Sequence, residues 1–468
     1  MIYEVVVVGG GVGGLTAAAL LAARGVSVCL LEKQSYVGGC LATVEHGSRK
    51  FEPTHGLYSG WEAGGIYERL FAALRTSGPH AHPERNAYVV RLPDGIEVPR
   101  TTQIEDFETY LGSAFPECAT AAIGFYRSLA NFTERETEPE PIVAAHLRRC
   151  SPRFQRFVDV QLQTLGQCSS DECSYEFVAS ALNPERRFWS IEGGAQTLVD
   201  TLAASFKQSG GTLRLNSNAL RLAYGTNDLP MGVDLLSGER VIATRAIVSN
   251  LTIWDTYGKL IGPARTPRNV SSALKSLRGW GVYQLFLTMN KSVARSLRSR
   301  PILALTDWQK DLSYDPEGAQ LVFSAGSPAS NDTAEGLAAV VSVYTNTEGW
   351  FSFHEDHAAH EERDQSMLKR VWSQMHRAIP ELGDGIELIE TATPQTYYEG
   401  TRRRFGMIGR VTSPPGFTDA TYGATPYENV FIVSDTASAG LGLEGVIQSA
   451  TKAANQICPN LTGDERSV

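Results

Sequence analysis

Glycines and one acid near the start of the chain have the types and spacing of a dinucleotide-binding site. Gly9, Gly11 and Gly14 follow four consecutive valines in the order G-x-G-x-x-G. In this pattern the first glycine permits a tight turn, the second lets a diphosphate approach the backbone, and the third allows close helix packing. Glu32 ends the next apolar stretch, where a carboxylate can accept hydrogen bonds from ribose hydroxyls.

The segments around these residues predict the βαβ unit that such a site needs. Residues 5–8 are all valine, which suits a strand buried on both faces. A helix is expected over 12–24, with Gly25 as the left-handed residue that ends it, and a second parallel strand over 26–32. A diphosphate would accept hydrogen bonds from the free amides at the helix N-terminus.

The glycine motif does not distinguish NAD from FAD, but the segment that follows Glu32 favours FAD. Gly38 and Gly39 form a loop whose amides could run along a second phosphate or the flavin edge, where an NAD domain would normally continue into another helix. Cys40 follows these glycines, and a packed thiol is favoured over a covalent or redox link to the flavin.

Two segments later in the chain also favour FAD. A helix over 197–208 is followed by a strand that contains Ala219 and Leu220 and returns to the nucleotide domain. A strand over 430–433 precedes Asp435, which is expected to hold the ribityl hydroxyls, although a simple turn role for this acid is the alternative.

A second G-x-G-x-x-G occurs at Gly440, Gly442 and Gly445. Only a short polar tail follows it, so we expect a helix N-terminus there rather than a second dinucleotide site. Its amides near Gly445 and Val446 would stabilise the negative charge of a reduced flavin. The predicted cofactor-binding residues are Gly9, Gly11, Gly13, Gly14, Glu32, Lys33, Gly38, Gly39, Cys40, Leu41, Ala219, Leu220, Asp435, Gly445 and Val446.

These motifs together resemble the flavin oxidoreductases of the amine oxidase superfamily, and more closely the phytoene desaturase family of carotenoid desaturases and isomerases. The closer resemblance lies in "GWEAGGIYERLFAAL", "AIVSNLT", "GWGVYQLFLTMN" and "TPQTYYEGTRRRFGMIGRV", which occur in the order of that family. The chain departs from the family at "FEPTHGLYSG", where an Asp is usual. His55 in this loop is the candidate catalytic residue, as a base or as a hydrogen-bonding partner of the substrate, and a structural hydrogen bond is the alternative.

The resemblance implies an α/β protein with a discontinuous Rossmann-type FAD-binding domain and a mixed α+β substrate domain formed by two insertions. The FAD-binding domain is expected over 1–75, 185–265 and 385–468. The substrate domain is expected over 76–184, which has helical periodicity, and 266–384, which alternates strand-like runs with a charged helix.

Composition excludes several other classes of protein. A net charge of −9 argues against nucleic acid as a partner, and no run of about eighteen apolar residues predicts a membrane-spanning helix. The first strand begins too early to leave room for a signal peptide, and seven cysteines without a C-x-x-C pair indicate a reduced, cytoplasmic protein.

No metal site is predicted. His354, His357 and His360 are more consistent with a solvated helix face than with ligands, and Cys168 and Cys173 lack a second ligand pair for zinc. The three consecutive arginines at 402–404 are interpreted as a solvated loop, with contact to the flavin or to an anionic membrane as the alternative.

The sequence therefore predicts an FAD-dependent oxidoreductase that desaturates or isomerises carbon–carbon bonds of a hydrophobic polyene or isoprenoid, by hydride transfer to flavin N5. The alternative is an amine oxidase-like or natural-product tailoring flavin enzyme that acts on a more polar small molecule. A reversible contact with a membrane surface is also expected, because a polyene substrate lies in the bilayer. The sequence leaves the oligomeric state open.

Overall fold

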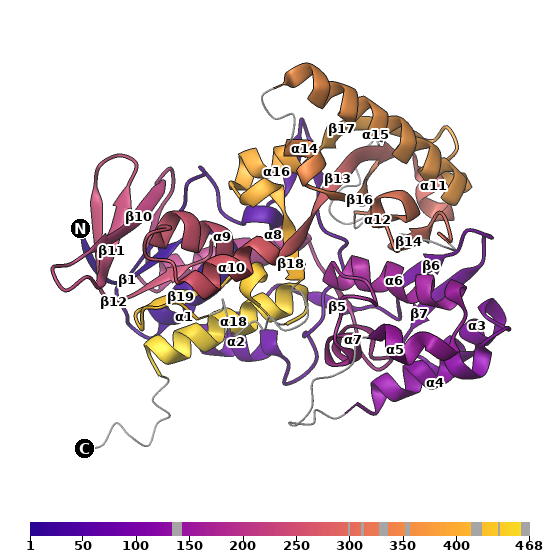
Figure 1. Ribbon diagram of the computed structural model, residues 1–468, viewed down its shortest axis with the longest axis horizontal. Helices are drawn as coiled ribbons and strands as arrows, with labels where there is room; N and C mark the ends of the chain where they lie inside the picture. Colours follow the sequence, from indigo (N-terminus) through magenta and orange to yellow (C-terminus); the bar gives the residue numbers. More distant parts are fainter. Residues whose placement is uncertain are drawn as a thin grey trace.

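The protein consists of two lobes, each built on its own β-sheet (Figure 1). The computed structural model describes residues 1–132, 143–297, 300–309, 313–326, 336–351, 356–412, 424–438 and 440–459. Within them, no helix is long and apolar enough to cross a membrane.

The first sheet has 7 strands in the order β10-β11-β12-β1-β2-β9, with β19 paired to β12. β1, β2, β9, β12 and β19 are parallel to their neighbours among these five, whereas β10 and β11 extend the sheet in antiparallel fashion. The strands are β1 Ile2–Val8, β2 Val28–Leu31, β9 Thr212–Arg214, β10 Ala219–Tyr224, β11 Pro230–Leu235, β12 Arg240–Ser249 and β19 Val430–Ile432.

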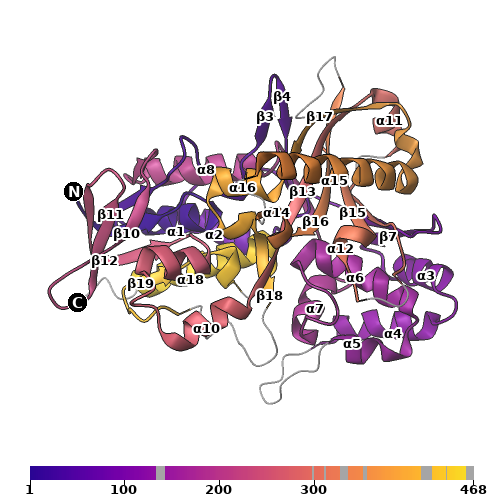
Figure 2. The same cartoon turned by 45° about the horizontal axis from the view of Figure 1, so that its top comes forward.

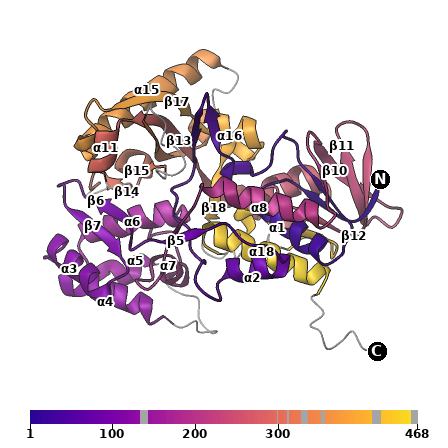
Figure 3. The same cartoon turned by 180° about the vertical axis from the view of Figure 1, so that it is seen from behind.

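Alternate valines of β1 pack on opposite faces of this sheet, which confirms a strand buried on both sides. Val5 and Val7 pack with four helices on one face, seen from behind in Figure 3, while Val6 and Val8 pack with residues of the other face. The four helices are α1 Val12–Ala23, α2 Ile66–Leu74, α8 Ala195–Gln208 and α18 Gly442–Ile457, and the other face carries α9 Ile253–Asp255 and α10 Arg268–Ser276.

The second sheet has 8 strands in the order β17-β13-β16-β15-β14-β6-β7, with β18 paired to β13. One face packs against the long helix α15, through side chains such as Leu285 and Val371. The strands are β6 Asn86–Arg91, β7 Glu97–Thr101, β13 Arg278–Met289, β14 Ile302–Leu305, β15 Gln320–Ala325, β16 Leu337–Asn346, β17 Ile386–Ala392 and β18 Ile408–Thr412, and α15 is His357–Ala378.

A group of helices packs beside β6 and β14 and builds the lower part of the second lobe in Figure 1. They are α3 Ile104–Ala114, α4 Ala119–Ala130, α5 Val143–His146, α6 Pro152–Gly166 and α7 Tyr175–Leu182. The first insertion is therefore largely helical and the second carries long strands, as their periodicity predicts. Smaller elements are β5 Ala81–Pro83, β8 Trp189–Ile191, α11 Lys291–Ser296, α12 Pro316–Ala319, α14 Glu348–Phe351 and α16 Pro394–Thr401.

Residues 386–412 belong to the second sheet, although the sequence assigns them to the flavin domain. β17 pairs with β13 from Ile386 to Ala392, and β18 pairs with the start of β13. The chain thus adds two more strands to the second sheet before β19 joins the first sheet. The hairpin of β3 Val44–His46 and β4 Arg49–Phe51 stands beside β17 between the lobes (Figure 2).

One disulfide corrects the expectation of a fully reduced chain. Cys168 and Cys173 are bonded to each other in the turn between α6 and α7, and both are buried. The two thiols meet because this short turn brings the end of one helix close to the start of the next. The other five cysteines are free.

Candidate functional site

A cavity of about 1040 Å³ lies at the carboxyl ends of the parallel strands and extends toward the second lobe. A crevice outside the carboxyl ends of such strands is where open α/β sheets bind ligands. All but two of the predicted cofactor-binding residues line it, and His55 lines it too. The lining residues among them are Gly9, Gly11, Gly13, Glu32, Lys33, Gly38, Gly39, Cys40, Leu41, Ala219, Leu220, Asp435 and Val446.

Gly14 and Gly445 do not line the cavity, contrary to their predicted contact with the cofactor. A Cβ on Gly14 would lie 2.1 Å from the carbonyl oxygen of Gly9, and one on Gly445 would lie 2.4 Å from the carbonyl carbon of Gly440. Both glycines therefore allow close backbone packing, which is the role of the third glycine in the motif.

The N-terminus of α1 offers the cavity a set of free amides. The N-cap residue is Gly11, which has no side chain to accept hydrogen bonds from the first amides of the helix. The first turn contains no acidic residue either. A Cβ on Gly13 would lie 2.1 Å from the carbonyl oxygen of Val433, so the first turn of α1 packs closely against the backbone just after β19. The arrangement fits the diphosphate of a dinucleotide, which accepts hydrogen bonds from such amides.

Glu32 follows the end of β2 and faces this turn. Its Oε2 accepts a hydrogen bond from the Gly10 amide at 2.6 Å, and its Oε1 accepts one from the Gln34 amide at 2.7 Å. These bonds hold the carboxylate at the wall of the cavity, where the motif requires an acceptor for ribose hydroxyls.

Basic side chains gather beside Glu32. Lys33, Lys259 and Arg402 line the cavity, and Lys33 interacts electrostatically with the other two, although Lys259 is paired with Asp255 at 2.6 Å. Burial, followed by the positive charge of Arg402, lowers the pKa of Lys33. Like charges held together in this way favour an anionic occupant, and the diphosphate of FAD supplies one.

Sequence reasoning missed Asn250 as a site residue. Its Nδ2 donates a hydrogen bond to the Val433 carbonyl at 2.7 Å, and a Cβ on Gly11 would lie 2.6 Å from its Oδ1. Asn250 follows β12, so its position after a predicted parallel strand, in "AIVSNLT", was the available signal.

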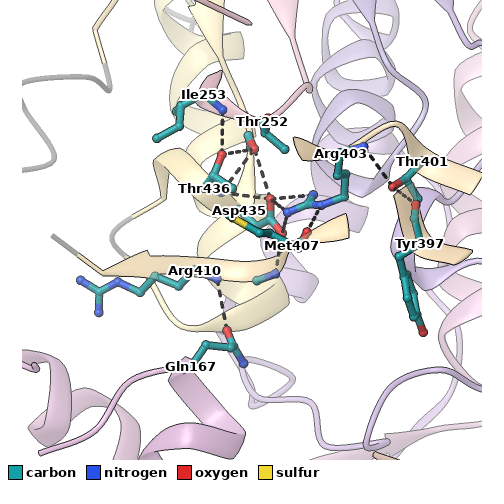
Figure 4. A network of polar contacts seen from close by, with 12 residues as sticks. Gln167, Thr252, Ile253, Tyr397, Thr401, Arg403, Met407, Arg410, Asp435 and Thr436 are labelled. Carbon is teal, nitrogen blue, oxygen red and sulfur yellow. Dashed lines mark hydrogen bonds and ion pairs between the residues drawn. The ribbon is translucent and has the colours of Figure 1, made fainter. Parts of the chain in front are cut away.

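The three consecutive arginines divide between the cavity and its surroundings. Arg402 and Arg403 line the cavity, whereas Arg404 does not and lies against the rings of Trp254 and Phe405. Arg403 forms an ion pair with Asp435 at 2.9 Å (Figure 4). The alternative of contact with the cofactor therefore gains support for two of the three.

His55 lies in the loop after β4, between the two lobes. Its Nε2 is 3.0 Å from the hydroxyl of Tyr344, which donates its own proton to the Thr164 carbonyl at 3.2 Å. His55 therefore donates through Nε2, and burial lowers its pKa to about 4. A pKa this far below the working pH makes the imidazole a weak proton acceptor, so a hydrogen-bonding role fits it better than that of a general base.

Glu52 anchors the same loop. Its Oε1 accepts hydrogen bonds from the Thr54 hydroxyl at 2.7 Å and from Tyr58, and from the Ala195 amide at 3.4 Å. Ala195 begins α8, so the carboxylate also meets the positive end of that helix. Glu52 thus fixes the loop that presents His55.

A second cavity of about 1180 Å³ lies on the other side of this loop. His55, Tyr58 and Tyr397 line both cavities. The wall of the second cavity carries charged side chains, which are Glu45, Lys50, Glu52, Glu84, Asp200, Arg300 and Glu390.

No cluster of three or more potential ligands for a metal ion occurs in the part of the chain that the structure describes. His357 begins α15 and is accompanied by His360 one turn later, while His354 lies outside the described residues.

Replacing His55 with Asn should reduce the loss of stability in acid. The pKa of His55 is about 4 in the folded protein and near 6.5 when unfolded, so the unfolded state binds more protons between these values. Stability should therefore fall by about 2 kcal/mol between pH 7 and pH 5 because of this group alone. Urea unfolding of both proteins across this range measures the difference.

His55→Gln, which also removes the titrating ring, is the second variant and should give the same pH dependence as His55→Asn. Equal slopes for the parent and His55→Asn would show that the ring titrates freely in the folded state.

Comparison with known proteins agrees with this geometry. Residues 12–458 match the family described as flavin containing amine oxidoreductase. A chloroplastic prolycopene isomerase from Arabidopsis thaliana is 22% identical over 510 residues, covering 100% of this chain and 84% of that protein. A phytoene desaturase from Cercospora nicotianae is 24% identical over 296 residues, covering 56% of this chain and 47% of that protein.

The fold recurs in a solved structure, an oxidoreductase from Methanosarcina mazei, with a TM-score of 0.70 at 15% identity over 97% of this chain and 99% of the other. The resemblance to carotenoid desaturases and isomerases and the Rossmann-type fold with a substrate domain are both confirmed. The chain belongs to the flavin containing amine oxidoreductase family and is an FAD-dependent oxidoreductase.

Proposed function

We propose that this enzyme desaturates or isomerises carbon–carbon bonds of a hydrophobic polyene or isoprenoid. The observation that carries the proposal is the similarity of the whole chain to a prolycopene isomerase, a protein named for a carotenoid. The partial match to a phytoene desaturase supports the same class of substrate.

His55 and the three tyrosines around its loop suit such a substrate because they stay uncharged near pH 7. Burial raises the pKa of Tyr344 to about 12, and it raises those of Tyr58 and Tyr397 further. His55 is neutral because its pKa lies near 4. These four groups do not gain or lose protons near neutral pH, as a substrate whose reacting hydrogens are all on carbon allows.

Part of the cavity wall on the side of the second lobe is apolar. It is lined by aliphatic and aromatic side chains from the His55 loop, α6, α7, β13 and the residue before β8, which are Leu57, Leu165, Phe177, Val282 and Phe188. Burial of a hydrocarbon chain against such a wall stabilises the complex by about 25 cal/mol per Å² of apolar surface.

When bound, FAD would supply the two-electron acceptor that removal of two hydrogens from neighbouring carbons of the substrate requires. The amides of the α1 N-terminus, Glu32 and the basic side chains beside it hold the nucleotide end. The apolar wall orients the chain and excludes water, and Glu52 keeps His55 and Tyr58 in place between the two cavities.

Anaerobic mixing of the purified holoprotein with phytoene or a cis-lycopene in detergent micelles tests the proposal. Desaturation should bleach the visible flavin absorbance and give a product that has lost two hydrogens. Isomerisation should give a product of unchanged mass with a shifted absorption spectrum. Squalane, which has no allylic carbon, is the control. Unchanged flavin absorbance together with the absence of any product from every polyene would count against the proposal.

The alternative is a flavin oxidase or desaturase that acts on a more polar small molecule. It is favoured by the second cavity, whose wall carries five carboxylates and two cations among the described residues. Bleaching by a primary diamine such as putrescine, with no response to polyenes, would support this alternative.

A reversible contact with a membrane surface is proposed with the polyene substrate, because the enzyme would take that substrate from a bilayer. The exposed large apolar side chains in the insertions include Ile96 and Tyr110. Neither side chain is part of the cavity wall.

A further inference from the structure

Arg403 is a cation held in the interior, in the wall of the FAD cavity. It lies in the connection between α16 and β18, and only 13% of its side chain is exposed. Its Nε donates to the carbonyl of Met407, and both terminal nitrogens donate to Asp435 (Figure 4). The segment that builds the second sheet thus sends one charged group into the cofactor site.

Asp435 has little hydrogen-bonding capacity left. Its Oδ1 accepts from Arg403 Nη1 at 3.0 Å and from the Thr436 amide at 3.0 Å, and the Ser434 hydroxyl lies 3.2 Å away. Its Oδ2 accepts from Arg403 Nη2 at 2.9 Å and from the Gly409 amide at 3.1 Å. A carboxylate offers about four acceptor positions, so this one is saturated without any ribityl hydroxyl.

Arg403, in contrast, keeps a donor in reserve. A guanidinium has five N–H groups. Among the described residues, Nη1 of Arg403 has one acceptor, Asp435 Oδ1, for its two hydrogens. Because Arg403 is among the residues that line the cavity, its remaining N–H is available to an occupant there.

The position of the pair fits the middle of the cofactor. Val433, two residues before Asp435, packs against Gly13 at the N-terminus of α1, where the diphosphate is expected. The helix α18, expected at the flavin ring, begins a few residues after Asp435. Arg403, paired with Asp435, therefore lies between the segments that are expected to meet the diphosphate and the ring.

We propose that Arg403 is an FAD-binding residue, which donates hydrogen bonds to the cofactor between its diphosphate and its ring. Asp435 positions this guanidinium and does not hold the ribityl chain itself.

The FAD dissociation constants of four variants, measured by titration of the apoproteins, test this assignment. Arg403→Met should weaken binding at least tenfold, and Arg403→Lys should weaken it less because a donor and the charge remain. Asp435→Asn should cost less than Arg403→Met, since the amide still accepts from the guanidinium. Arg404→Met, the same change one residue away and outside the cavity wall, should stay within twofold of the parent.

Thermal unfolding with and without FAD separates binding from a purely structural role. A smaller FAD-dependent increase in Tm in Arg403→Met than in the parent, at equal FAD concentration, supports the assignment. A lower Tm of the apoprotein with an unchanged increase on adding FAD would overturn it. A larger loss of affinity in Asp435→Asn than in Arg403→Met would also overturn it, because it would mean that Asp435 contacts the cofactor directly.

Discussion

Replacing Gly11 with Leu should give a folded protein that is colourless and binds no measurable FAD. The Gly11 Cα faces the cavity, and Gly39 lies close on the opposite side, where its own Cβ would be 3.5 Å from that Cα. A leucine side chain would occupy the space through which the diphosphate must reach the amides of α1. We expect a loss of affinity of more than 1,000-fold, about 4 kcal/mol, measured by FAD titration of the apoprotein.

The backbone itself is not the obstacle, which makes this substitution informative. Gly11 has φ −73° and ψ 176°, a conformation open to any residue, and the nearest atom to a new Cβ is Asn250 Oδ1 at 2.6 Å. The matched control is Gly124→Leu, an exposed position in α4 where nothing lies within 4 Å of a new Cβ. Retention of the yellow colour in Gly11→Leu would show that the cofactor lies elsewhere.

The sequence predicts the first lobe well because its signals are local. Four valines, a glycine turn and an alanine-rich helix together specify a strand–turn–helix unit, and α1 begins at Val12 as expected. The helix α8 and the strand β19 also form within a few residues of their predicted bounds.

The second sheet is less accessible to such reasoning. β17 and β18 are short, follow the second insertion directly and carry no signal of which sheet they join. Their assignment depends on pairing with β13, more than one hundred residues earlier in the chain. Periodicity predicts that a strand forms, and it does not predict its partner.

The residues of the candidate site also fall into two groups, those that local motifs predict and those that only the folded chain brings together. Residues of the glycine motifs were found because a diphosphate needs bare backbone at fixed spacing. Asn250 and the pairing of Arg403 with Asp435 were not, since both depend on segments that meet only in the folded protein. His55 was found as a candidate, but its low pKa depends on burial in the folded protein, and its hydrogen-bond partner Tyr344 is far away in the sequence.

Replacing Glu32 with Ala should weaken FAD binding about ten- to hundredfold or more. The change removes the acceptor expected for the ribose hydroxyls, and charge-assisted hydrogen bonds of this kind contribute roughly 1.5–3 kcal/mol each. It also releases the amides of Gly10 and Gln34, which the carboxylate now holds at 2.6 Å and 2.7 Å. FAD titration of the apoprotein, followed by flavin fluorescence, measures the effect.

Glu4 offers a matched control toward the opposite, amino-terminal end of β1 and β2. Its Oε2 accepts from the Ser27 amide at 2.9 Å, so Glu4→Ala removes a comparable carboxylate–backbone bond outside the cavity wall. We expect Glu4→Ala to leave FAD affinity within twofold, and an equal loss in both variants would mean that Glu32 supports the fold without contacting the ribose. Glu32→Gln should fall between parent and Ala, because one amide oxygen can replace only one of the two carboxylate acceptors and its NH₂ group then faces a backbone N–H.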